Sequence, residues 1–100
     1  MFKEVSEKIN NGKFVRIKIE HTTSKINKIQ ITGDFFLHPE DFLNILEKCA
    51  EQKPTNITAE NLEKEFTTLQ KKHQAELIGI TTSDLARLIT RAIQQWKPGE

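Results

Sequence analysis

The chain has 100 residues, of which 36% are hydrophobic and 29% are charged. This length fits one compact domain and excludes a catalytic cleft between two domains. A domain of this size buries about 65% of the surface of its unfolded chain, which leaves little room for a deep enclosed pocket. Fifteen Lys and Arg against 14 Asp and Glu give a net charge of +1, so the whole molecule has no strong attraction for nucleic acid or an anionic membrane. A large substrate must therefore be bound on the surface or together with a partner.

Cys49 is the single cysteine of the sequence. One cysteine excludes an internal disulfide and a thiolate-rich zinc or iron–sulfur site, and it is typical of a reducing compartment. The apolar runs are far shorter than the roughly 20 residues of a membrane-spanning helix, and no apolar signal segment follows Met1. We therefore expect a cytoplasmic protein with no membrane partner.

The first third of the sequence predicts β structure. Residues 1–11 are weakly patterned and are expected to form an extended N-terminal arm. Residues 13–36 are expected to form an antiparallel hairpin, because apolar and polar side chains alternate on both sides of a polar turn. The side chains expected on its inner face are those of Val15, Ile17, Ile19, Ile29 and Ile31.

The hairpin ends in two consecutive phenylalanines. A period of two places Phe35 on the same face as Ile31 and Phe36 on the polar face, so one of the two rings is expected to lack a place in the same core. Pro39 follows, and proline suits the first position of a helix. Amphipathic patterns predict three helices, over residues 39–51, 59–73 and 82–96.

Local signals support the starts of the second and third helices. Thr58 is the expected N-cap of the second helix, and Thr81 with Asp84 resembles a capping box at the start of the third. Between these helices, residues 77–80 are expected to form a buried crossing. Together the elements predict an α+β fold, in which a small antiparallel sheet of two or three strands is packed on one face by about three helices.

The sequence contains no recognisable catalytic machinery. His21, His38 and His73 are isolated from one another and lack the spacing of a metal site. Cys49 lies in the apolar arc of the first predicted helix, where a free cysteine usually behaves as a small buried hydrophobe. The scattered glycines form no phosphate-binding loop. We therefore expect no catalytic, cofactor-binding or metal-binding residue in this chain; a sulfur carrier would instead require a reactive Cys49.

Charge is unevenly distributed along the sequence. Residues 11–33 carry five basic side chains and one acidic one, a balance of +4, and residues 34–51 carry one basic and five acidic ones, a balance of −4. The basic strands could bind an acidic partner or nucleic acid, but a polar outer face is also normal for a sheet covered on one side. Arg87 and Arg91 on the last predicted helix leave an alternative function, a small helix-turn-helix-like nucleic-acid-binding domain or another protein-interaction domain.

Three blocks of the sequence resemble a known family. Residues 31–40, with the core Gly33-Asp34-Phe35-Phe36 and a proline three residues later, resemble a motif of lipoate-protein ligases. The similarity is closer to the C-terminal accessory domain of those enzymes, which in some archaea is a separate small subunit beside the catalytic one. It continues upstream over residues 12–17 and downstream over residues 76–81 and 84–86.

The resemblance implies an accessory role. In that family the large catalytic part holds ATP, Mg and lipoate, forms lipoyl-adenylate and transfers the lipoyl group to carrier domains, such as those of 2-oxoacid dehydrogenases or of glycine cleavage. The small domain is needed to activate free lipoate. The resemblance thus implies a non-catalytic subunit that forms a heterodimer with the catalytic subunit and has no nucleic-acid partner. It also implies a fold related to sulfur-mobilising and iron–sulfur scaffold proteins.

The motif suggests where the catalytic subunit would bind. Glycine allows a close backbone approach, an aspartate can accept a hydrogen bond, and an exposed phenylalanine is a typical anchor of an interface hot spot. An alternative explanation is that the motif only builds a strand-to-helix corner, with both rings buried. The expected interface residues are Gly33, Asp34, Phe35, Phe36, His38 and Pro39.

Overall fold

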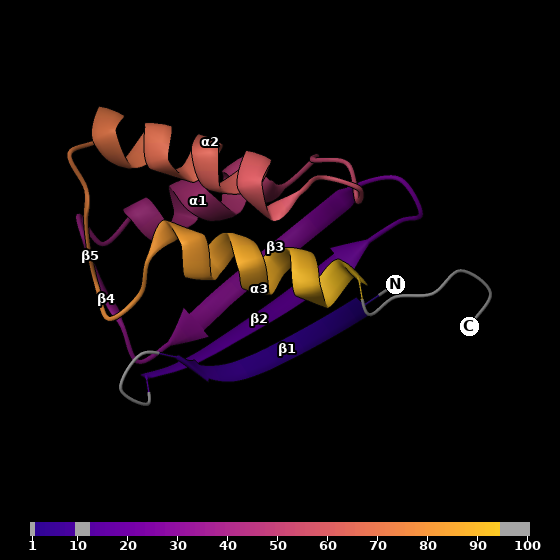
Figure 1. Cartoon of the computed structure of the whole chain (residues 1–100), viewed down its shortest axis with the longest axis horizontal. Helices are drawn as coiled ribbons and strands as arrows, with labels where there is room; N and C mark the ends of the chain where they lie inside the picture. Colours follow the sequence, from indigo (N-terminus) through magenta and orange to yellow (C-terminus); the bar gives the residue numbers. More distant parts are fainter. Residues whose placement is uncertain (1, 10–12, 95–100) are drawn as a thin grey trace.

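The computed structural model describes residues 2–9 and 13–94 of the chain. Within these ranges the chain forms a three-stranded antiparallel sheet in the order β1-β2-β3, a two-stranded antiparallel ribbon of β4 and β5, and three helices. The helices lie on one face of the three-stranded sheet (Figure 1). This arrangement confirms the predicted α+β fold. The elements are β1 (Phe2–Ile9), β2 (Lys13–His21), β3 (Ile26–Gly33), β4 (Phe36–His38), α1 (Phe42–Ala50), α2 (Ala59–Lys72), β5 (Glu76–Ile78) and α3 (Thr82–Gln94).

The core lies between the sheet and the helices. The five inner residues predicted for the hairpin are all buried, and Ile17 at the centre of β2 lies opposite Val5 of β1 and Ile31 of β3. α1 packs against β3, whereas α3 packs against β1 and β2, and α2 lies against both other helices. Apolar burial between these two layers is the main force that holds them together. The helices contribute, among others, the fully buried side chains of Phe42, Leu46, Leu62, Phe66, Leu85, Leu88 and Ile89.

The antiparallel pairing of β2 with β3 confirms the predicted hairpin, but two details of the β structure differ from the prediction. The expected N-terminal arm over residues 1–11 is instead the edge strand β1 over Phe2–Ile9, which pairs with β2 along its whole length and buries Val5 and Ile9. The expected hairpin over residues 13–36 ends at Gly33, and Phe36 begins a strand of the separate ribbon. Residues 1 and 10–12 lie outside the described residues.

The predicted helices differ from the observed ones mainly at their ends. The first was predicted over residues 39–51 but begins at Phe42, because the chain before it pairs in the ribbon and then turns. The second, predicted over residues 59–73, ends at Lys72, and Thr58 caps it as predicted by accepting a hydrogen bond from the Asn61 N–H at 3.1 Å. The third was predicted over residues 82–96, and residues 95 and 96 lie outside the described residues.

The capping box at the start of α3 is confirmed. The Asp84 N–H donates to the Thr81 hydroxyl at 3.0 Å, and the Thr81 N–H donates to the Asp84 carboxylate at 3.2 Å. The buried crossing predicted just before it is only partly correct. Glu76–Ile78 forms β5, whose alternation turns Leu77 inward and leaves Ile78 54% exposed. No helix in residues 2–9 and 13–94 is long and apolar enough to cross a membrane.

Candidate partner interface

The β4–β5 ribbon carries an exposed apolar pair. Phe36 lies opposite Ile78, Leu37 opposite Leu77, and His38 opposite Glu76. Because successive side chains of a strand point to opposite faces, Leu37 and Leu77 turn together toward the core. The other four residues share the opposite face, which we call the outer ribbon face (Phe36, His38, Glu76 and Ile78).

Solvent reaches most of the apolar surface of this face. Phe36 is 73% exposed and Ile78 is 54% exposed. Among the described residues, the other large hydrophobic side chain exposed in this way is Phe2, which begins β1 at the opposite end of the sheet (Figure 1). Two directly opposed apolar side chains that remain in water are a candidate anchor for a protein partner.

A tightly packed corner holds the ribbon against the sheet. Gly33 approaches Phe14 so closely that a Cβ on Gly33 would lie 2.3 Å from the Phe14 carbonyl oxygen. The Asp34 N–H donates to that same oxygen at 2.8 Å. Phe35 is half-buried beside the corner, and a Cβ on Gly79 would lie 3.6 Å from the Cβ of Phe35. Gly79 has φ +88°, a conformation that disfavours any side chain.

The structure separates the roles of the predicted interface residues. Phe35 is half-buried and packs against the core, whereas Phe36 points outward. The alternative in which both rings are buried is therefore wrong, although Gly33 and Phe35 do build the strand-to-helix corner. Among the other predicted residues, Gly33, Asp34 and His38 are exposed and Pro39 is half-buried. Their contact with a partner stays a prediction.

Sequence reasoning missed the β5 side of the outer ribbon face. Ile78 and Glu76 are about 40 residues away from their β4 partners in the chain, and only long-range pairing brings them together. One signal was available, because residues 76–81 form one of the three blocks that carry the family resemblance. Those blocks converge at one end of the molecule, where the ends of β2 and β3 meet β4 and β5 (Figure 1).

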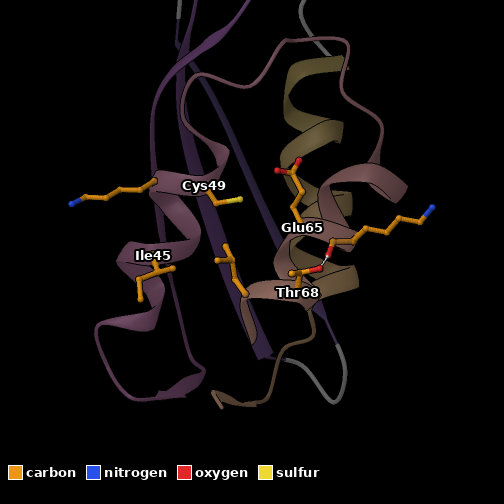
Figure 2. A pocket seen from close by; sticks show the side chains of 7 residues that line it. Ile45, Cys49, Glu65 and Thr68 are labelled. Atoms are coloured by element: carbon orange, nitrogen blue, oxygen red, sulfur yellow. Dashed lines mark hydrogen bonds between the residues drawn. The ribbon is translucent and has the colours of Figure 1, made fainter. Parts of the chain in front are cut away.

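A second surface feature is the groove between α1 and α2 (Figure 2). It has a volume of about 560 Å³, and the half-buried Cys49 thiol points from α1 across it toward α2. Burial raises the pKa of the Cys49 thiol, and the nearby Glu65 carboxylate raises it further. A raised pKa lowers the thiolate fraction, which is the reactive form. This environment argues against a sulfur carrier.

The structure also argues against the nucleic-acid alternative. Arg87 donates to the Glu7 carboxylate at 2.8 Å, and Arg91 also pairs with Glu7, so both arginines of α3 are bound to β1. The connection between α2 and α3 contains a β-strand and not the short turn of a helix-turn-helix. Within the described part of the chain, no group of three His, Cys, Asp or Glu could hold a metal ion.

Comparison with known proteins identifies the fold. No protein-family model and no curated protein matches the chain. Among solved structures, the fold is similar to one chain of an archaeal lipoylation system from Thermoplasma acidophilum, described as a bi-partite lipoate protein ligase and its E2 lipoyl domain. The TM-score is 0.68 with 21% sequence identity, and the match covers 89% of this chain and 97% of that chain.

This match confirms, at the level of fold, the resemblance seen in the sequence. The chain has the α+β architecture of a protein from a lipoylation system. Because 89% of 100 residues covers 97% of the other chain, the matched chain is itself about as small as this one. The expected relation to sulfur-mobilising and iron–sulfur scaffold folds stays a prediction.

Proposed function

We propose that this chain is the non-catalytic accessory subunit of a two-subunit lipoate-protein ligase. It binds the catalytic subunit and enables the ATP-dependent activation of free lipoate to lipoyl-adenylate. The observation that carries this proposal is the fold similarity, which extends over nearly the whole of both chains and pairs this chain with a small protein of an archaeal lipoylation system that contains a bi-partite lipoate protein ligase. The motif around Gly33-Asp34-Phe35-Phe36 supports the same family independently of the fold.

The chemistry of lipoate activation then belongs to the partner. ATP, Mg and lipoate bind to the catalytic subunit, and the lipoyl group passes to carrier domains such as those of 2-oxoacid dehydrogenases or glycine cleavage. The small subunit contributes a surface and not a reacting group. This division is consistent with the raised pKa of Cys49 and with the ion-paired arginines of α3. The lone cysteine favours the cytoplasm as the place where the complex works.

The outer ribbon face is the surface we assign to the catalytic subunit. Its apolar centre is held by the corner of Gly33, Phe35 and Gly79, so Phe36 and Ile78 are positioned before the partner binds. A surface ordered in advance loses less conformational entropy on association than a flexible one. Rigid aromatic anchors of this kind are where binding energy concentrates at protein interfaces.

This assignment is tested by measuring association with the catalytic subunit from the same organism. We expect Phe36→Ala to weaken binding by about 2 kcal/mol, or roughly thirtyfold, as is typical of a hot-spot residue. Isothermal titration calorimetry provides the dissociation constant. Because Phe36 is 73% exposed, its truncation should leave the fold intact, as judged by circular dichroism.

Phe2→Ala is the matched control for this experiment. It removes the same side chain from a position that is 79% exposed, at the far end of the sheet from the ribbon. We expect Phe2→Ala to bind like the natural chain. Equal affinities of all three proteins would contradict the assignment of the outer ribbon face, and no binding by the natural chain would contradict the accessory function itself.

A further inference from the structure

β3 is an edge strand of the three-stranded sheet, and two features cover its outer edge. At its start, the segment that follows α1 pairs with it. The Ile26 N–H donates to the Lys53 carbonyl at 2.8 Å, and the Ile26 carbonyl accepts from the Gln52 N–H at 2.6 Å. This part of the edge is therefore already occupied by backbone of the same chain.

Farther along β3, a side chain takes the place of a neighbouring strand. The Ile31 N–H donates to the Glu47 carboxylate of α1 at 2.8 Å. In an extended sheet, this outward-pointing amide would donate to a carbonyl of the next strand. The backbone N–H and C=O groups of a strand point to the same edge at every second residue. Those of Ile29 therefore point to the same edge as those of Ile31, and they lie between Glu47 and the segment that covers Ile26.

The partial burial of Glu47 favours a stable contact between its carboxylate and the Ile31 N–H. Glu47 is half-buried where α1 lies against β3, and it helps to line a hollow of about 550 Å³ together with Ile29, Gln30, Asn44 and Glu51. Burial raises the pKa of the Glu47 carboxyl, although the hydrogen bond from Ile31 acts in the opposite direction. The Glu47 side-chain oxygen therefore occupies the Ile31 amide that an added strand would need, and α1 covers this part of the edge.

We infer that Glu47 is an edge-capping residue that closes β3 to strand addition by a second copy of this chain. With Glu47 in place, four residues (27–30) lie between the two covers, and a register shift between Ile26 and Lys28 interrupts their regular pattern. An irregular stretch of this length offers little edge to a pairing strand. Without it, the edge from Ile29 to Gly33 becomes continuous and long enough to pair. The cap thus blocks self-pairing through β3. This inference is independent of the proposed function, because it concerns the chain alone.

The test compares self-association of three variants by sedimentation velocity over a wide range of protein concentration. Glu47→Ala removes the carboxylate and should produce a concentration-dependent dimer. Glu47→Gln keeps an oxygen that can accept from Ile31 and should behave like the natural chain. Glu51→Ala removes the same charge one helical turn away in the same hollow and should also leave the mass distribution unchanged. Identical distributions for Glu47→Ala and the natural chain, or dimerisation of Glu47→Gln to the same extent as Glu47→Ala, would overturn the inference.

Backbone amide exchange of the natural chain, followed by NMR, provides a measurement that does not depend on a variant. The amide proton of Ile31 should exchange at least about tenfold more slowly than that of Ile29, because a hydrogen bond to a charged acceptor is stronger than one to water. Equal exchange rates for the two amides would mean that Glu47 does not hold the edge in solution.

Discussion

Phe35 and Phe36 are neighbours in the sequence, but they face opposite ways in the structure. The alternation of the preceding strand predicted that one ring would share the face of Ile31 and the other would not. That argument identified the outward ring correctly, although the two rings lie beyond the end of β3. The sequence could not reveal that Ile78 lies opposite Phe36, because the pairing joins distant segments. The structure thus shows that the exposed Phe36 ring is one half of an apolar pair with Ile78.

The two glycines beside Phe35 are required for different physical reasons, and this difference gives a prediction. Gly33→Ala should lower the free energy of unfolding by about 3 kcal/mol, because the added Cβ would lie 2.3 Å from a backbone oxygen that cannot move aside easily. Gly79→Ala should cost about 1 kcal/mol, because the space is adequate but φ is +88°. Urea denaturation of both variants provides the comparison. A smaller loss for Gly33→Ala than for Gly79→Ala would contradict the close approach at Phe14.

At the scale of elements, features that depend on local sequence signals, such as helix caps, were predicted more reliably than the pairing of strands. The caps at Thr58 and Thr81 act within three residues of themselves, and both hydrogen bonds are present. The strand β1 was missed because its pattern is weak and its stability comes from β2 and α3. The start of α1 was placed too early because residues 36–38 pair with β5, a constraint that no local signal reveals.

Glu7 joins β1 to α3, and its titration provides a second prediction. The hydrogen bond from Arg87, together with the charges of Arg87 and Arg91, holds the pKa of the Glu7 carboxyl below its ordinary value of 4.5. A carboxyl with a lowered pKa in the folded state stabilises the fold above its unfolded pKa, and this contribution is lost as the pH falls through the folded pKa. We expect Glu7→Gln to reduce the free energy of unfolding at neutral pH by up to about 1 kcal/mol.

The measurement is urea denaturation of the natural chain and of Glu7→Gln from neutral pH to below pH 4. The difference between them should shrink as the solution becomes more acidic than the ordinary pKa of a glutamate. Glu63→Gln removes the same charge from α2 and is the control for general charge effects. A difference that stays constant, or grows, on acidification would show that Glu7 is not stabilised by its arginines.

At the scale of the whole molecule, the predicted basic face of the sheet must be reconsidered, because β1 adds acidic residues beside the basic residues of β2. The basic residues of β2 are partly neutralised by this strand: Glu4 lies opposite Lys18 and forms an ion pair with Arg16 at 3.2 Å. The outer sheet face is therefore better described as a mixed, solvated surface than as a basic one. The end of the molecule that remains distinctive is the ribbon, where the three blocks of family resemblance meet.

The central claim is that this chain enables lipoate activation without performing it. The most direct measurement is the rate at which the catalytic subunit of the same organism forms lipoyl-adenylate from lipoate and ATP–Mg, with and without this chain. A parallel assay measures transfer of the lipoyl group from preformed adenylate to a carrier domain. We predict that adenylate formation requires the chain, that transfer depends on it much less, and that the chain alone forms no adenylate. Adenylate formation at the same rate by the catalytic subunit alone would contradict the claim.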